Sequence, residues 1–158
     1  MLPEGCDPAV FASPHLKWSE LACVNRLGYP FEHIPPGALI APYPLDWRAS
    51  RGRMLGRIFE AVREIAGHPL VVNSAYRTRA YNALVGGAGN RSMHLFGRAI
   101  DLALPPDDLD AVWREVRRRA IDHAPIFSEI GGIGKGAAFL HLDNRFRTSQ
   151  GRIVEWTY

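Results

Sequence analysis

The sequence is poor in cysteine and lysine, and each shortage excludes a class of protein. Its 158 residues include only two cysteines, Cys6 and Cys23. Two cysteines cannot build a disulfide framework or a cysteine-rich metal site, so any bound metal must be held by histidine and carboxylate. They could form a single bridge, but we expect free thiols. Lysine occurs only at Lys17 and Lys135, so 17 of the 19 basic residues are arginine.

The sequence also lacks long apolar runs and low-complexity stretches. No segment approaches the roughly 18 to 20 apolar residues that a membrane-spanning helix needs. The first ten residues, MLPEGCDPAV, have neither the basic nor the apolar region of a secretory signal peptide. With 47% hydrophobic residues, the chain is too apolar to be disordered. We therefore expect one soluble domain over residues 1–158 that buries a hydrophobic core.

Basic residues outnumber acidic ones, which gives a formal net charge of +3. Such a surplus favours anionic surroundings, for example nucleic acid, phospholipid headgroups or cell-wall polymer. The one dense basic run, residues 117–119, follows a helical pattern, and such a run is usually a solvated helix face. It lacks the interleaved aromatic residues that stack on nucleic-acid bases. We therefore expect no nucleic-acid partner.

Apolar periodicity and turn-forming residues predict an α+β fold. Residues 1–45, rich in proline and glycine, predict an irregular N-terminal wrap with one short helix near residues 19–23, which Ser19 could cap. Residues 46–158 form the predicted core. Strands and helices come in clusters without regular alternation, which indicates a small, largely antiparallel sheet flanked by helices.

Within this core, the clearest helix spans residues 46–66 and ends at Gly67. A second long helix begins near Asp107 or Asp108, either of which could cap it, and runs to about His123. The other predicted elements are a short helix over 78–85, a loop over 86–90, and strands over 70–74, 99–104, 130–134 and 139–143.

Two of the six histidines have neighbours that indicate chemistry. His94 and Asp101 lie seven positions apart, across a glycine that permits a bend. Asp101 falls inside an apolar strand, where a buried carboxylate needs hydrogen bonds, a cation or a metal. Further on, His141 and Asp143 share one face of a strand because strand side chains alternate. Two imidazoles and one carboxylate suit catalytic zinc. The alternative is that Asp101 caps a helix or pairs with an arginine and that His94 is incidental.

Several short motifs occur in a single order along the chain. In that order they resemble the zinc D-alanyl-D-alanine carboxypeptidase family, in particular its small murein-peptidase branch found in bacteria and in phage lysins. The resemblance covers residues 14 to 156 and implies a fold like that of the hedgehog and D-Ala-D-Ala peptidase domains. The motifs are Ser74-Ala75-Tyr76-Arg77-Thr78, Tyr81-Asn82, Gly86-Gly87-Ala88, Ser92-x-His94-x-x-Gly97-x-Ala99-x-Asp101, Gly131-Gly132-Ile133-Gly134 and Phe139-x-His141-x-Asp143.

The resemblance implies that His94, Asp101 and His141 bind Zn²⁺. It also matches Arg77 to the family arginine that borders the site. A guanidinium there can hold a substrate carboxylate or a developing oxyanion. The alternative for Arg77 is a structural ion pair with Asp101 or Asp143.

Other residues near these motifs have weaker claims to a role. Ser92 could bind substrate or orient His94, or it could simply form a turn. The aromatic residues Tyr76, Phe96 and Trp156 could wall a cleft. Because aromatic residues are more often part of the core, we do not count them as site residues.

The general base is where the sequence departs from the family. Better-known relatives carry Glu or Asp three residues before the last histidine ligand, and this chain has Ala138 there. Asp143 could activate water, or it could hold His141 in the tautomer that binds the metal. Glu129 is the other candidate base, with plain surface charge as its alternative. A protein without a base could still polarise water through zinc, but more slowly.

These observations predict a zinc-dependent metallopeptidase that acts on peptidoglycan stem peptides or their cross-links, as a carboxypeptidase or an endopeptidase. The alternative is a catalytically silent zinc-binding module with a structural or wall-binding role. Ala138 supports this alternative, because relatives carry an acid at that position. An arginine-rich nucleic-acid binder is a minor third hypothesis. We expect a monomer whose partners are peptidoglycan peptides. A phage endolysin, a cytoplasmic enzyme that recycles wall peptides and a chain without its leader all fit the sequence.

Overall fold

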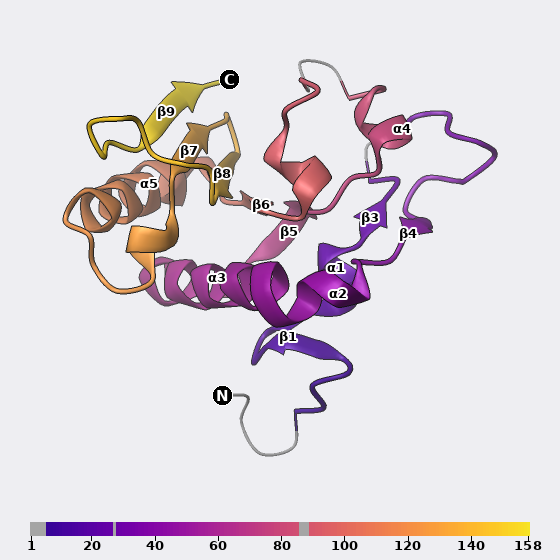
Figure 1. Ribbon diagram of the computed structural model, residues 1–158, viewed down its shortest axis with the longest axis horizontal. Coiled ribbons are helices and arrows are strands. Elements are labelled where there is room, and N and C mark those ends of the chain that lie inside the picture. The colour runs from indigo at the N-terminus through magenta and orange to yellow at the C-terminus, as the bar shows by residue number, and fades with distance from the viewer. Residues whose placement is uncertain (1–5, 27, 86–88) are drawn as a thin grey trace.

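The chain folds into a five-stranded sheet whose one face is covered by two long helices, with short elements from the first 45 residues packed beside them (Figure 1). The computed structural model describes residues 6–26, 28–85 and 89–158. Its helices are α1 (Trp18–Leu21), α2 (Leu45–Trp47), α3 (Arg53–Ala66), α4 (Arg79–Asn82) and α5 (Pro106–Ile121), with a π turn η1 (Arg48–Gly52) and 3₁₀ turns η2 (Met93–Phe96) and η3 (Phe127–Glu129). Its strands are β1 (Phe11–Ser13), β2 (Leu16–Lys17), β3 (Cys23–Val24), β4 (Leu39–Ala41), β5 (Val71–Ser74), β6 (Ala99–Ala103), β7 (Gly132–Lys135), β8 (Phe139–Asp143) and β9 (Val154–Thr157).

The sheet has the strand order β5-β6-β8-β7-β9. Every neighbouring pair is antiparallel except β7 and β9, which run parallel. The prediction of an α+β fold with a small, largely antiparallel sheet is therefore confirmed. Strands β5 to β8 correspond to the four predicted strands. The sequence did not predict β9, because the strand has only four residues and is half exposed. Pairing with β7, rather than a strong apolar pattern, orders it.

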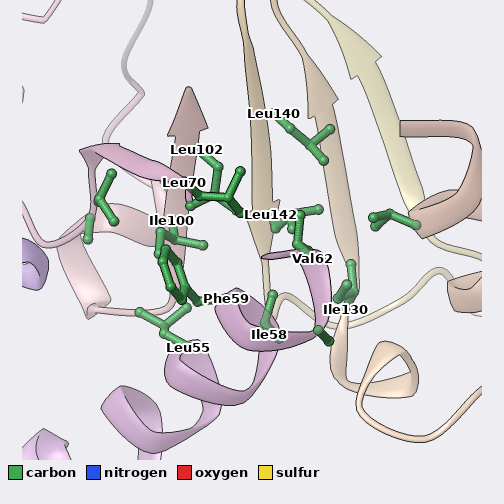
Figure 2. Packing of buried hydrophobic residues seen from close by; sticks show 14 of the residues in the cluster. Leu55, Ile58, Phe59, Val62, Leu70, Ile100, Leu102, Ile130, Leu140 and Leu142 are labelled. Carbon is green, nitrogen blue, oxygen red and sulfur yellow. The ribbon is translucent and has the colours of Figure 1, made fainter. Parts of the chain in front are cut away.

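One face of this sheet forms the hydrophobic core. The apolar residues of β6 and β8 on this face are completely buried, and Figure 2 shows them facing the apolar stripe of α3. Each fully buried side chain of this size contributes about 1.5–3 kcal/mol to folding. The residues that meet here are Leu55, Ile58, Phe59 and Val62 from α3 and Ile100, Leu102, Leu140 and Leu142 from the sheet.

The long predicted helix over residues 46–66 is continuous but not uniform. It begins at α2, passes through the π turn of η1 and continues as α3. At the end of the π turn, a Cβ on Gly52 would lie 2.5 Å from the Trp18 ring, so glycine lets the helix lie against that ring. Gly67 ends α3 in the left-handed conformation, as the sequence predicted.

Both predicted N-terminal helix caps were wrong. Ser19 lies inside α1, which instead begins after Lys17, and the Lys17 N–H donates to the Glu20 carboxylate at 2.8 Å. Helix α5 begins at Pro106, with Pro105 in the cap position. Proline is favoured at the first helical position, which Pro106 occupies, because the N–H of that position has no partner within the helix. The two aspartates after it lie in the first turn, where negative charge favours the helix dipole.

The described part of residues 1–45 is more ordered than an irregular wrap. Strands β1 and β2 pair with each other, β3 pairs with β4, and β1 lies below α3 in Figure 1. Both cysteines are free, as expected. The Gly86-Gly87-Ala88 motif lies outside the described residues. Within the described ranges, no helix is both long and apolar enough to cross a membrane.

Candidate metal centre and cleft

His94 is placed by a short turn and a glycine. It lies in η2, and Gly97 follows with a φ of +60°, a left-handed conformation that glycine adopts without strain. This bend returns the chain into β6, which carries Asp101. The His94 Nδ1–H donates to the carbonyl oxygen of Ala75 at 2.5 Å, so Nε2 is the ring atom that faces the site.

The antiparallel pairing of β6 with β8 brings the other two candidate ligands together. Asp101 and His141 are direct partners in the register, and their side chains project from the face opposite the core. His141 Nδ1 lies 2.7 Å from Asp101 Oδ1 and 3.3 Å from His94 Nε2. His94 Nε2 lies 3.3 Å from Asp101 Oδ2. The three side chains are buried, with exposed fractions of 3 to 6%.

These three side chains fit a metal ion. Each offers one ligand atom, and the three atoms lie within 4.8 Å of one another. In a tetrahedral zinc site with bonds near 2.0–2.1 Å, ligand atoms are about 3.3 Å apart, which is the separation between His94 Nε2 and His141 Nδ1. Two imidazoles and one carboxylate also leave a coordination position for water or substrate, as catalytic zinc requires.

Burial and the neighbouring charges shift the pKa of each of the three residues. Burial lowers the pKa of His94, so its imidazole stays neutral and able to bind a metal. Burial alone would raise the pKa of Asp101, but the imidazoles of His94 and His141 hold it well below its ordinary value. Burial would likewise lower the pKa of His141, and the carboxylates of Asp101 and Asp143 more than offset this and raise it. Asp101 is therefore ionised, which is the state in which a carboxylate binds a metal.

Asp143 lies behind His141, on the side away from the candidate ligands. Its side chain is completely buried, and Oδ2 accepts a hydrogen bond from His141 Nε2 at 2.9 Å. Burial raises the pKa of Asp143, but hydrogen bonds from His141 and Arg145 outweigh burial and lower it to about 2. An ionised carboxylate can only accept hydrogen bonds, so His141 Nε2 carries a proton, and Nδ1 is the ring nitrogen that faces Asp101 and His94.

Arg77 connects the candidate metal ligands to the next strand. Its Nη2 donates to Asp101 Oδ2 at 3.2 Å, and its Nε donates to Ser74 Oγ at 2.8 Å. Its backbone N–H also donates to the His94 carbonyl oxygen at 3.1 Å. Arg77 thus makes the ion pair with Asp101 that the sequence left open, and it also lines the cleft in front of the site.

That cleft has a volume of about 860 Å³ and is lined by residues from the sheet, η2 and the N-terminal segment. Four arginines line it, and Asp101 is the one carboxylate among its described lining residues. Ser92 lies at its wall, half-buried and directly before η2. An aromatic group adjoins His141 at one end, where the Trp156 ring lies 5.1 Å from the imidazole. The arginines are Arg26, Arg77, Arg91 and Arg145, and the other rings of the aromatic group are Phe139 and Tyr158.

The structure does not bring Glu129 to this cleft. Glu129 lies in η3 and accepts hydrogen bonds from Arg57 of α3 at 2.8 and 2.9 Å. Ala138 lies exposed in the turn before β8 and adds no carboxylate either. Among the described residues that line the cleft, none is a carboxylate free of the candidate ligand set.

Sequence reasoning missed two residues of this region. Arg145 was not considered, although it follows Asp143 at the two-residue spacing that keeps side chains on one face of a strand. Trp156 was left out as a core residue, yet it is half-buried and lines the cleft. Its place depends on β9, which the sequence did not predict.

Comparison with known families identifies the chain. The family model for peptidase M15 matches residues 40–143, which include the three candidate ligands and Asp143. The chain belongs to the peptidase M15 family. No curated protein matches the chain. The resemblance to zinc D-alanyl-D-alanine carboxypeptidases is thus confirmed, and the M15 chain is a peptidase of a metal-dependent family with a buried His-Asp-His group suited to a metal ion.

Proposed function

We propose that this M15 peptidase uses Zn²⁺ to hydrolyse peptide bonds in peptidoglycan stem peptides or their cross-links. The observation that carries the proposal is the buried group of His94, Asp101 and His141 at the floor of an arginine-lined cleft. His94 Nε2, His141 Nδ1 and the Asp101 carboxylate would hold the ion. When bound, zinc supplies Lewis acidity, which polarises a carbonyl and lowers the pKa of water.

The charge of the cleft supports an anionic peptide as substrate. Of its four arginines, Arg77 pairs with Asp101 and Arg145 pairs with Asp143. Arg26 donates to the backbone carbonyl oxygens of Val72 and Glu20 and keeps its charge. Stem peptides of peptidoglycan carry free carboxylates, and arginine binds carboxylates in a fixed geometry with charge-assisted hydrogen bonds.

Arg77 is the residue we assign to the reacting groups. Its guanidinium is held by Ser74 and Asp101 and is nine-tenths buried at the wall of the cleft. A fixed cation in a poorly solvated position stabilises negative charge better than a mobile surface arginine. We propose that it binds either the terminal carboxylate of the substrate or the oxygen that becomes negative during hydrolysis. Ser92, at the same wall, would donate to the substrate backbone.

Asp143 takes an orienting role in this proposal rather than the role of general base. Both of its oxygens already accept hydrogen bonds, from His141 and from Arg145. Glu129 is occupied by Arg57 outside the cleft. A positioned general base contributes about 10²–10⁴-fold to the rate, so we expect slower turnover than in relatives that carry an acid at the position of Ala138.

The test is hydrolysis of purified muropeptides, followed by mass spectrometry. Zinc-loaded protein should release a terminal D-alanine or split a cross-linked dimer, and the masses of the products distinguish these two reactions. A chelator and the His94→Ala change should each abolish cleavage. His68→Ala is the matched control, because His68 pairs with Asp108 and does not line the cleft. Cleavage that survives both the chelator and His94→Ala would exclude zinc catalysis.

The second candidate function is a zinc-binding module without catalysis. The absence of a free carboxylate among the described cleft residues favours it. It predicts zinc bound at one equivalent, lost in His94→Ala, with every muropeptide left intact. That combination of results would replace the peptidase proposal.

A further inference from the structure

Strand β7 has glycine at the two positions that face the candidate metal centre. Gly132 is the register partner of Asp143, and Gly134 is the partner of His141. A Cβ on Gly132 would lie 2.5 Å from Asp143 Oδ1 and 2.6 Å from Arg145 Nε. The motif Gly131-Gly132-Ile133-Gly134 therefore leaves space for side chains that lie across the strand.

Trp156 fills the space above the second glycine. It is the partner of Gly134 in the parallel pairing of β7 with β9, and a Cβ on Gly134 would lie 2.6 Å from its Cε2 atom. The indole ring lies 5.1 Å from the His141 imidazole, and the Arg145 guanidinium carbon lies 4.5 Å from the centre of the indole. Trp156 thus contacts both the candidate ligand His141 and Arg145.

Arg145 fixes Asp143 from several directions. Its Nε donates to both carboxylate oxygens at 2.9 Å, and its Nη2 donates to Oδ2 at 2.5 Å. Its backbone N–H donates to Oδ1 at 3.0 Å. Asp143 Oδ2 in turn accepts from His141 Nε2 at 2.9 Å. These contacts form a continuous chain from Arg145 through Asp143 to the imidazole of His141.

We propose that Arg145, held between Trp156 and Asp143 above the glycines of β7, is a positioning residue that fixes His141 with its proton on Nε2 and its Nδ1 toward the metal. The inference rests on the metal role of His141 in the proposed function. It extends beyond the matched family region, because Arg145 and Trp156 follow residue 143. Outer partners of this kind set the orientation and basicity of a histidine ligand.

The test is the zinc affinity of Arg145→Met, measured by competition with a chromophoric chelator. We expect a loss of about 10–100-fold, the range found when the hydrogen-bonded partners of metal ligands are removed. The second readout is the ¹⁵N spectrum of His141 in the zinc-loaded protein. The wild type should show a protonated Nε2 that exchanges slowly with water, and Arg145→Met should lose this slow exchange.

Arg117→Met is the matched control, because Arg117 also makes a two-point pair with a carboxylate, that of Glu155 on β9, but does not contact Asp143 or His141. It should leave zinc affinity and the His141 spectrum unchanged. Arg145→Lys keeps the positive charge but lacks the planar set of N–H donors of the guanidinium, so it should give an intermediate zinc affinity. If Arg145→Met does not fold, Arg145→Lys decides the question. Zinc affinity within twofold of wild type in the folded variant overturns the proposal.

This outcome is separable from failure of the proposed function. A wild-type protein that binds zinc but cleaves no muropeptide would remove the peptidase role and leave the affinity test intact. An active enzyme whose zinc affinity does not depend on Arg145 would remove only the inference about Arg145.

Discussion

The two faces of β8 differ in what each buried side chain requires from its neighbours. Leu140 and Leu142 face the helices and need only apolar volume around them, as Figure 2 shows. His141 and Asp143 alternate with them, are equally buried, and have a specific polar partner at each functional atom. Burying an unpaired charge costs far more free energy than shifting a methyl group. Each polar atom on the site face therefore needs a partner at a defined position, whereas the core face needs only side chains of the right total volume.

The largest expected effect comes from the site face. His141→Ala removes a candidate ligand. We expect the rate of hydrolysis to fall roughly a thousandfold or more, because several kcal/mol of transition-state stabilisation are lost. Bound zinc, measured by elemental analysis after dialysis, should fall below one equivalent. If His141→Ala retains full zinc and wild-type turnover, His141 is not a ligand and the distinction between the faces fails.

Leu142, the next residue along β8, faces the core, and we expect its replacement to lower stability without affecting zinc binding or hydrolysis. Leu142→Ala leaves a cavity against α3. We expect the free energy of unfolding, measured by urea denaturation, to fall by about 2–5 kcal/mol. Well below its melting temperature, the variant should still bind one zinc and hydrolyse substrate. Loss of zinc from the folded variant would show that the two faces are not independent.

The glycines of β7 test how tightly the site face is packed. Gly134→Ala places a Cβ 2.6 Å from the Trp156 ring, so the ring must move. We expect a loss of about 1–3 kcal/mol in stability, together with a several-fold loss of zinc affinity. Ile133→Val, one residue away and facing the core, should cost about 0.5–1.5 kcal/mol and leave zinc affinity unchanged. Equal zinc affinities in the two variants would contradict the role given to Trp156.

The smallest effect is expected at Glu129, outside the cleft. Glu129→Gln breaks a partly exposed pair with Arg57, and such pairs contribute about 0.2–1 kcal/mol. The rate of muropeptide hydrolysis should stay at the wild-type value in a steady-state assay. A drop of a hundredfold without loss of zinc would restore Glu129 as the general base.

Much of the fold could be predicted from the sequence because the signals are local. The apolar stripe of α3, its end at Gly67 and the alternation in β6 and β8 are each contained in a few consecutive residues. The predictions failed where pairing or packing decides the outcome. Strand β9 is ordered by β7, and the caps of α1 and α5 depend on backbone geometry that several nearby residues could have provided.

The sequence by itself determined which residues could form the metal centre. The order of the motifs carries the resemblance that implies His94, Asp101 and His141 as ligands, and the two-residue period of strands places His141 and Asp143 on one face; both are properties of the chain alone. Only the tertiary structure decided what surrounds them. In the folded chain, Asp143 accepts a hydrogen bond from His141 and Glu129 forms an ion pair with Arg57. Arg145 and Trp156 lie across the glycines of β7. The physical reason is that hydrogen-bond partners and buried charges are set by contacts across strands, whose spacing in sequence is not fixed by any local period.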